Sequence, residues 1–173
     1  GDIKLFEKML RKVVLAVFSY HDFSGEPEKV YHALVCALLI WVANTHEIKS
    51  NRESGYGRYD IMIIPHDVTR IGYVIEFKTV DKEDNETVET AVEAALAQIE
   101  EKKYETELIA RGIENIKKLA VVFSGKDVYV KDEYMYLADE IFGFRIVNIS
   151  NLSSPLEVSY YGSSYIARDV YLK

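Results

Sequence analysis

The segment Glu76-Phe77-Lys78 places a carboxylate and an ammonium group two positions apart inside an otherwise apolar stretch. In a β-strand successive side chains alternate between faces, so Glu76 and Lys78 would project together while Phe77 projects the other way. Two charges in such a stretch are costly to bury unless they have partners or a chemical task. Taken alone, the segment is explained most simply as a structural glutamate–lysine pair.

A second carboxylate, that of Asp60, makes a metal site an equal alternative. Asp60 opens the preceding apolar stretch, and fifteen residues separate it from Glu76. That gap accommodates a strand, a turn and a returning strand, so a hairpin could place the two carboxylates side by side. Two hard oxygen ligands beside Lys78 suit Mg²⁺, which polarises a scissile phosphate and lowers the pKa of a water. The lysine would orient or help to deprotonate that water.

Residues 50–60 lead directly into Asp60 and contain two glycines and two arginines. Glycine permits close approach of a backbone, and the guanidinium groups of Arg52 and Arg58 suit bidentate contacts with phosphates. Arg52 and Arg58 are therefore candidates for binding a nucleic-acid backbone. An ordinary polar loop accounts for these residues equally well.

The remaining sequence predicts the elements that must position these side chains. Apolar positions at helical spacing predict a helix over residues 3–18 and a second over 27–43. The second helix is apolar on nearly all sides, so we expect it to be buried. The other expected elements are paired strands over 59–64 and 72–80, a helix over 87–111 capped by Gly112, and strands over 118–123 and 128–131. The order α-α-β-β-α-β predicts a mixed α/β domain over residues 1–131.

Residues 132–173 are rich in tyrosine and serine and differ in character from the preceding domain. Short strands are expected near residues 144–149 and 165–172. We therefore expect residues 132–173 to form a small β-rich C-terminal extension of the same domain that adds to the sheet or covers an edge. Its tyrosines would suit the interface of a homodimer.

Several of these motifs, taken together, resemble a known family over about residues 28–126. The further motifs are Tyr31-His32, the segment over residues 95–104, and Phe123-Ser124-Gly125-Lys126. The combination is similar to the PD-(D/E)xK nuclease-like domain usually found behind an AAA-type ATPase-like domain in bacterial and archaeal proteins. The chain has no room for the ATPase-like domain, which would fit a fragment excised from a longer protein.

This resemblance implies a restriction-endonuclease-like core, a mixed β-sheet flanked by helices. It implies Asp60 and Glu76 as ligands of Mg²⁺, with Mn²⁺ as a substitute, and Lys78 as the catalytic lysine. The expected activity is metal-dependent hydrolysis of phosphodiester bonds in nucleic acid, with DNA expected before RNA. A catalytically inactive nuclease-fold domain that binds nucleic acid or a protein partner is the first alternative, and an α/β interaction module with an accidental motif is the second.

Members of the superfamily often add an acid or a histidine from the first core helix to the metal site. Glu28 and His32 are four residues apart, so they would share one face of the helix over residues 27–43. The resemblance therefore implies His32, or Glu28, as a further metal ligand. A histidine that is simply satisfied inside the core is the alternative.

Gln98 and Tyr104 resemble the glutamine–tyrosine pair of RecB-type nucleases, in which the two residues are four positions apart. Here they are six positions apart, and a regular helix turns about 100° per residue, which puts them on different sides. Lys102 shares the face of Gln98. We therefore expect Gln98 and Lys102, rather than Tyr104, to lie near the nucleic acid.

The formal net charge of −7 argues against binding nucleic acid through a broadly basic surface. Many of the acids fall within residues 81–107 and could form a face remote from a local basic cleft. The sequence has a single cysteine, no apolar run approaching the roughly 20 residues that span a bilayer, and no signal-peptide pattern. These features favour a cytoplasmic protein without a membrane segment.

Overall fold

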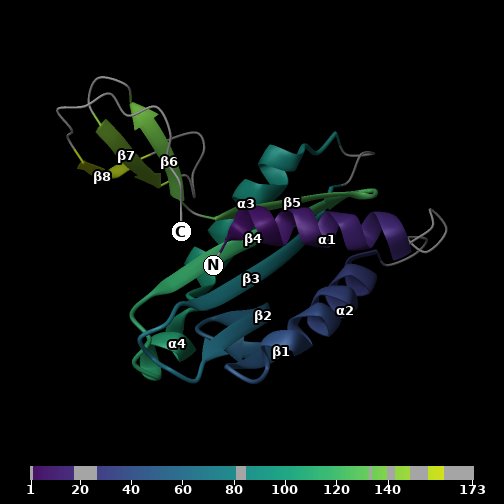
Figure 1. Ribbon diagram of the computed structural model, residues 1–173, viewed down its shortest axis with the longest axis horizontal. Helices are drawn as coiled ribbons and strands as arrows, with labels where there is room; N and C mark the ends of the chain where they lie inside the picture. Colours follow the sequence, from purple (N-terminus) through teal and green to yellow (C-terminus); the bar gives the residue numbers. More distant parts are fainter. Residues whose placement is uncertain are drawn as a thin grey trace.

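A mixed sheet of five strands forms the centre of the fold, in the spatial order β1-β2-β3-β4-β5 (Figure 1). Its strands are β1 (His46–Ser54), β2 (Gly57–Pro65), β3 (Gly72–Thr79), β4 (Ile116–Ser124) and β5 (Asp127–Asp132). β3 and β4 run parallel, and the other neighbours pair antiparallel. The computed structural model describes residues 2–17, 27–80, 85–132, 134–139, 143–148 and 156–161.

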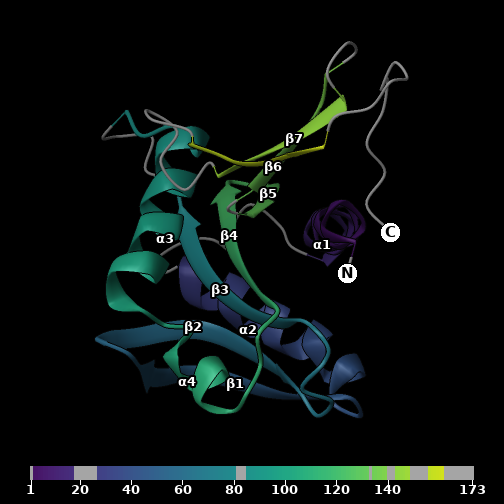
Figure 2. The same ribbon diagram turned by 90° about the vertical axis from the view of Figure 1, so that its left-hand side faces the viewer.

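Helices cover both faces of this sheet, as Figures 1 and 2 show. They are α1 (Ile3–Val17), α2 (Pro27–Leu39) with the short 3₁₀ helix η2 (Ile40–Val42), α3 (Val88–Lys102) and α4 (Thr106–Ala110). Leu10 of α1 and Tyr31 of α2 share one core with Phe77, whereas Ile99 and Leu108 share another with Val74. Because β3 is buried on both faces, its sequence is nearly continuous in apolar residues, and Glu76 stands out in it.

The expected mixed sheet flanked by helices is confirmed, including the helix over residues 3–18 and the strand pair that carries Asp60 and Glu76. The expectation for α2 is wrong, because only one of its faces is buried. Tyr31 and Val35 are buried while Ala33 and Ala37 are exposed. Among the described side chains of α2, the exposed ones are Glu28, Lys29 and the two alanines, and alanine costs little to leave in water because it buries little area.

Two further segments differ from what the sequence suggested. The alternative of an ordinary polar loop over residues 50–60 is wrong, because β1 and β2 form a hairpin that turns at Gly55 and Tyr56. The helix expected over residues 87–111 is two helices, because α3 ends at Lys102 and α4 begins at Thr106. Both differences bring side chains to the candidate site that the expected elements would have kept apart.

A second, three-stranded antiparallel sheet follows β5. It consists of β6 (Tyr134–Asp139), β7 (Gly143–Asn148) and β8 (Leu156–Tyr161), in the order β6-β7-β8. This confirms a small β-rich C-terminal appendage, and β7 matches the strand expected near residues 144–149. The strand expected near 165–172 lies outside the described residues. A domain division at residues 131 and 132 and a homodimer contact through this segment stay predictions.

Within the described ranges, none of the helices combines the length and the apolar character needed to cross a membrane.

Candidate active site

The strands β2 and β3, which carry Asp60 and Glu76, stop pairing with each other at these two residues. The β2–β3 ladder runs from the Ile63–Tyr73 pair to the Ile61–Ile75 pair, so Asp60 and Glu76 lie one step beyond its last pair. There the Asp60 side chain replaces a backbone acceptor, because its Oδ2 accepts a hydrogen bond of 2.8 Å from the backbone N–H of Phe77. This bond fixes a half-buried carboxylate beside Glu76.

Asn51 faces this point from β1. The β1–β2 ladder pairs Ser50 with Ile61 and Arg52 with Tyr59, and Asn51 between them has a φ of 53°. Asparagine is one of the few residues besides glycine that visits the left-handed region routinely. The resulting irregularity turns the amide Nδ2 of Asn51 to within 3.3 Å of the ring of His32 on α2.

His32 joins α2 to the β1–β2 hairpin at the position of Asp60. Its Nε2 lies 3.3 Å from the backbone carbonyl of Asp60 and 3.1 Å from Oγ of Ser50. Its ring also packs edge-on against Phe77, with 5.6 Å between ring centroids. The structure therefore places His32 against the backbone that carries the first carboxylate.

Glu76 is the most deeply buried charged side chain of the described core, at 3% exposure. Its Oε1 accepts a hydrogen bond of 3.3 Å from Lys78 and another from the amide of Gln98. Its Oε2 has no hydrogen-bond partner among the residues that the structure describes. Burial, with the charge of Asp60 adding to it, raises the pKa of Glu76 to about 8 against the opposing charge of Lys78.

This donor set fits a divalent cation. A buried carboxylate oxygen without a partner, beside a second carboxylate, offers the hard oxygen ligands that Mg²⁺ prefers. A cation there would favour the ionised form of Glu76 and remove the repulsion from Asp60. Within the described ranges no group of three or more histidine, cysteine, aspartate or glutamate side chains is placed to hold a metal ion.

Gln98 on α3 orients both charged side chains of β3. Its Oε1 accepts a hydrogen bond of 2.8 Å from Nζ of Lys78, while its Nε2 donates to Glu76 and, at 3.1 Å, to the hydroxyl of Tyr104. Only one orientation of the amide satisfies all these partners, because the carbonyl must face the ammonium group and the NH₂ group the carboxylate. Gln98 lies inside α3, four residues before that helix ends at Lys102. Its amide contacts both Glu76 and Lys78.

The expectation that Tyr104 points away from this cluster is wrong. The expectation assumed a regular helix, but α3 ends at Lys102 and Lys103 adopts a left-handed conformation with a φ of 51°. The chain therefore turns back, and the buried Tyr104 side chain reaches Gln98. No glycine or proline in this segment signals the turn. Burial raises the pKa of the Tyr104 phenol, so its hydroxyl keeps its proton.

The tip of the β1–β2 hairpin is seated on the end of α3. The backbone N–H of Tyr56 donates to the carbonyl of Lys102 at 2.7 Å. Gly55 has a φ of +61°, and a Cβ atom there would lie 2.2 Å from that same carbonyl oxygen. At Gly57 a Cβ atom would lie 3.1 Å from the ring of Tyr104, so both tip glycines permit close packing.

Gly55→Ala should therefore destabilise the protein more than Gly125→Ala. Gly125 also has a positive φ, of +60°, but nothing lies within 4 Å of its Cβ position, so it measures backbone strain alone. That strain is about 1–2 kcal/mol, whereas Gly55→Ala must also displace the hairpin tip from α3. Urea unfolding of both variants measures the difference. Equal losses of stability would show that the tip is not seated as described.

The other residues expected at the site lie around this cluster. Glu28 lies in the first turn of α2, and partial burial of its carboxyl group together with the charge of Asp60 raises its pKa, while Lys78 and His32 lower it. Arg52, Arg58 and Lys102 are exposed on the hairpin and at the end of α3. The roles of Glu28 and His32 as metal ligands stay predictions, as do the nucleic-acid contacts of Arg52, Arg58, Gln98 and Lys102.

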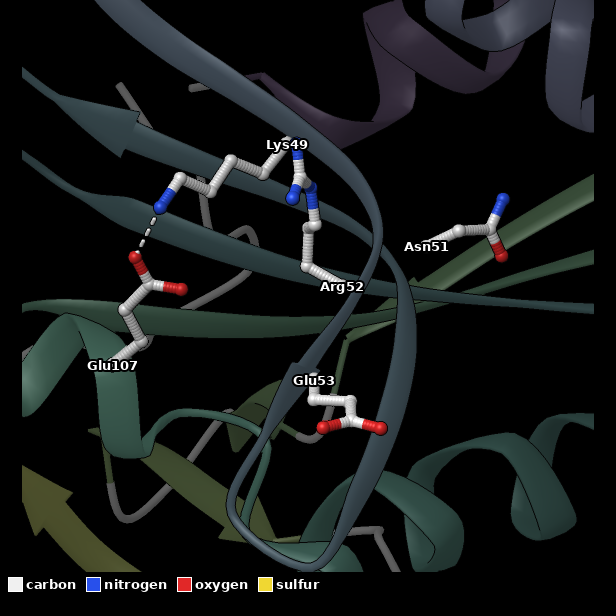
Figure 3. A pocket seen from close by; sticks show the side chains of 5 residues that line it. All are labelled: Lys49, Asn51, Arg52, Glu53 and Glu107. Carbon is white, nitrogen blue, oxygen red and sulfur yellow. Dashed lines mark hydrogen bonds and ion pairs between the residues drawn. The ribbon is translucent and has the colours of Figure 1, made fainter.

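A surface hollow of about 540 Å³ lies along β1, lined by Lys49, Asn51, Arg52, Glu53 and Glu107 (Figure 3). Two of its charged residues, Lys49 and Glu107, form an ion pair with each other. Lys49 bonds Glu107 at 2.6 Å, and although burial opposes the shift, hydrogen bonds from Lys49 and Arg111 lower the pKa of Glu107. Neither Asp60 nor Glu76 lines the hollow, although Asn51, which lies opposite Asp60 in the β1–β2 hairpin, does.

Glu76→Gln should stabilise the metal-free protein in a pH-dependent way. The folded-state pKa of Glu76 is raised, so ionised Glu76 disfavours folding, and the penalty grows from about pH 4.5 to 8. A neutral glutamine avoids it and can still accept from Lys78 and Gln98. In EDTA the variant should exceed the parent by on the order of 1–4 kcal/mol at pH 9 and by little at pH 5. A pH-independent difference in the unfolding free energy would contradict the raised pKa.

The comparisons with known proteins agree with this geometry. Residues 26–133 match the family profile described as PD-(D/E)XK nuclease superfamily, which covers more than half of the chain. Residues 124–162 also match a profile described as LVIVD repeat. No curated protein and no solved structure matches the chain. The matched segment includes every strand of the five-stranded sheet and the whole Asp60, Glu76 and Lys78 set, and the chain belongs to the PD-(D/E)XK nuclease superfamily.

Proposed function

We propose that this chain is a divalent-metal-dependent nuclease that hydrolyses phosphodiester bonds of nucleic acid, and of DNA in preference to RNA. The observation that carries the proposal is the carboxylate of Glu76. It is buried beside Asp60, one of its oxygens has no hydrogen-bond partner within the described ranges, and Lys78 lies 3.3 Å from the other. Burying an ionised carboxylate with an unpaired oxygen lowers the stability of the fold unless a bound cation balances its charge.

Asp60 and Glu76 would hold the cation. Mg²⁺ characteristically keeps several waters and takes one or two carboxylates together with phosphate oxygens, which suits a site with two protein carboxylates. When bound, Mg²⁺ or Mn²⁺ would neutralise phosphate charge and lower the pKa of a nearby water. The hydrogen bond from Phe77 holds Asp60 in place for this task without occupying its second oxygen.

Lys78 would act on the water and the phosphate. Its ammonium group is about one quarter exposed and is held by Gln98 and Glu76, so it is oriented but reachable. From there it can orient a water and offset the negative charge that develops on the phosphate. Tyr104 would act through Gln98 as a positioning residue, because its hydroxyl accepts from the amide that holds Lys78.

A second candidate is a nuclease-fold domain that binds nucleic acid or a protein partner without cutting. The net charge of −7 favours it, because a strongly acidic chain disfavours contact with a phosphate backbone. Single- and double-stranded DNA and RNA should be incubated with the protein in Mg²⁺, in Mn²⁺ and in EDTA, with cleavage and binding followed separately. Cleavage in either metal and not in EDTA supports the nuclease, and binding without cleavage supports the second candidate.

A further inference from the structure

The tip of the β1–β2 hairpin presents a large aromatic side chain to solvent. Tyr56 is 74% exposed, whereas Tyr59 and Tyr104, which lie nearby in the fold, are buried. Nζ of Lys103 lies 5.8 Å from the centre of its ring, at a distance that allows a cation–π contact. A tyrosine ring in water next to a lysine is suited to stacking against another flat, polarisable group.

The backbone under this ring is fixed. The N–H of Tyr56 is bonded to the carbonyl of Lys102, and the approach at Gly55 is too close for any side chain. A ring presented from a fixed backbone has only two side-chain torsions to order when a ligand stacks on it. The entropy cost of binding there is therefore small.

Exposed cations lie on the hairpin tip and on the adjoining end of α3, although the whole chain is acidic and Glu53 lies across the strand pair from Arg58. Arg58, Lys102 and Lys103 are all exposed near the tip. In the part of the chain that the structure describes, no ion pair with a carboxylate is formed by any of the three. Unpaired cations beside an exposed aromatic ring are the combination that binds single-stranded nucleic acids.

The tip is in continuous contact with the candidate active site. Gly57, next to Tyr56 in the chain, lies against the ring of Tyr104. The hydroxyl of Tyr104 accepts from Gln98, and Gln98 accepts from Lys78. Tyr56 also precedes Asp60 by only four residues, a rise of roughly 13 Å along an extended strand, so a single strand of a few nucleotides held at the tip would span the distance to the carboxylate pair.

We propose that Tyr56, with Arg58, Lys102 and Lys103, forms a binding site for single-stranded nucleic acid. The ring stacks on an unpaired base while the cations contact the flanking phosphates. A duplex does not satisfy this site, because each base face is already covered by its neighbours in the stack. This inference rests on the proposed function, which makes nucleic acid the ligand. It adds that the bound nucleic acid is single-stranded.

The binding test uses Glu76→Gln protein in EDTA, so that no strand is cut, and the fluorescence anisotropy of a labelled deoxythymidine oligonucleotide. Tyr56→Ala should weaken binding by about tenfold, whereas Tyr56→Phe should bind like the parent. Trp41→Ala is the matched control, because Trp41 is also an exposed aromatic side chain, at 85%, and lies in η2. Trp41→Ala should leave the affinity unchanged.

A second readout detects the stacking itself. The chain has one tryptophan, so Trp41→Phe combined with Tyr56→Trp leaves a single indole at the tip. Its fluorescence should be quenched by the single strand and not by a duplex of the same length. Unchanged affinity of Tyr56→Ala, or equal quenching by the duplex, would overturn the inference and leave the proposed nuclease activity untouched. Tyr56-dependent binding by a protein that cuts nothing would support the inference and remove the proposed function.

Discussion

Lys78→Ala should lower the rate of nucleic-acid cleavage on the order of 10²-fold or more while leaving metal binding intact. The ammonium group of Lys78 is held at 2.8 Å by Gln98 and faces the carboxylate of Glu76, yet it contributes no ligand atom to a metal. Removing it takes away the charge and the orientation that act on the reacting phosphate. Single-turnover cleavage rates and a metal titration measure the two effects separately.

Lys49→Ala is the control for this substitution. Lys49 has nearly the same side-chain exposure, 25% against 28%, and it also bonds a glutamate, but on the hollow along β1. Its truncation should change the cleavage rate by no more than a few-fold. Lys78→Arg should not restore activity, because a planar guanidinium cannot replace a compact ammonium group beside a water. If Lys78→Ala cuts as fast as the parent, the role assigned to Lys78 is wrong.

Asp60→Asn should abolish both cleavage and the stabilisation of the fold by metal. A ligand that binds only the folded protein adds about 2.7 kcal/mol when present at 100 times its Kd. For a chain of this size each kcal/mol raises the Tm by about 2–4 °C. Mg²⁺ or Mn²⁺ should therefore raise the Tm of the parent by several degrees and leave the Tm of Asp60→Asn unchanged.

Asparagine is the right replacement because the fold uses Asp60 as well. The amide oxygen of asparagine can still accept the hydrogen bond from Phe77, whereas Asp60→Ala would leave that N–H without its acceptor, at a cost of about 1–3 kcal/mol. Asp127→Asn removes a half-exposed carboxylate that pairs with Arg11 and should respond to metal like the parent. The same rise of Tm in Asp60→Asn and the parent would show that the metal binds elsewhere.

The centre of the site could be predicted from the sequence because it follows from strand periodicity. Alternation places Glu76 and Lys78 on one face, and the length of the hairpin determines that Asp60 arrives opposite Glu76. Both strands are buried on two faces, so their apolar composition is a strong signal, and the charged residues within them are conspicuous.

The surroundings of the site could not be predicted because their signals are weak. β1 is an edge strand of mostly polar residues, so it shows neither the alternation nor the apolar content of a buried strand. The contact between Gln98 and Tyr104 depends on a left-handed lysine that nothing local requires. Gly55 and Tyr56 pack against the end of α3 through a contact between residues far apart in the sequence. The sequence of the hairpin alone does not predict that contact.

A metal-dependent nuclease that uses Asp60, Glu76 and Lys78 should lose its activity when Glu76 loses its charge. Single-turnover cleavage of end-labelled single- and double-stranded DNA in Mg²⁺ tests this, with the parent and Glu76→Gln expressed and purified side by side. We expect fragments from the parent that vanish in EDTA, and none from Glu76→Gln, which should retain its fold and its hydrogen bonds to Lys78 and Gln98. Equal cleavage by both proteins, or no cleavage by a parent that binds metal at Asp60 and Glu76, would contradict this expectation.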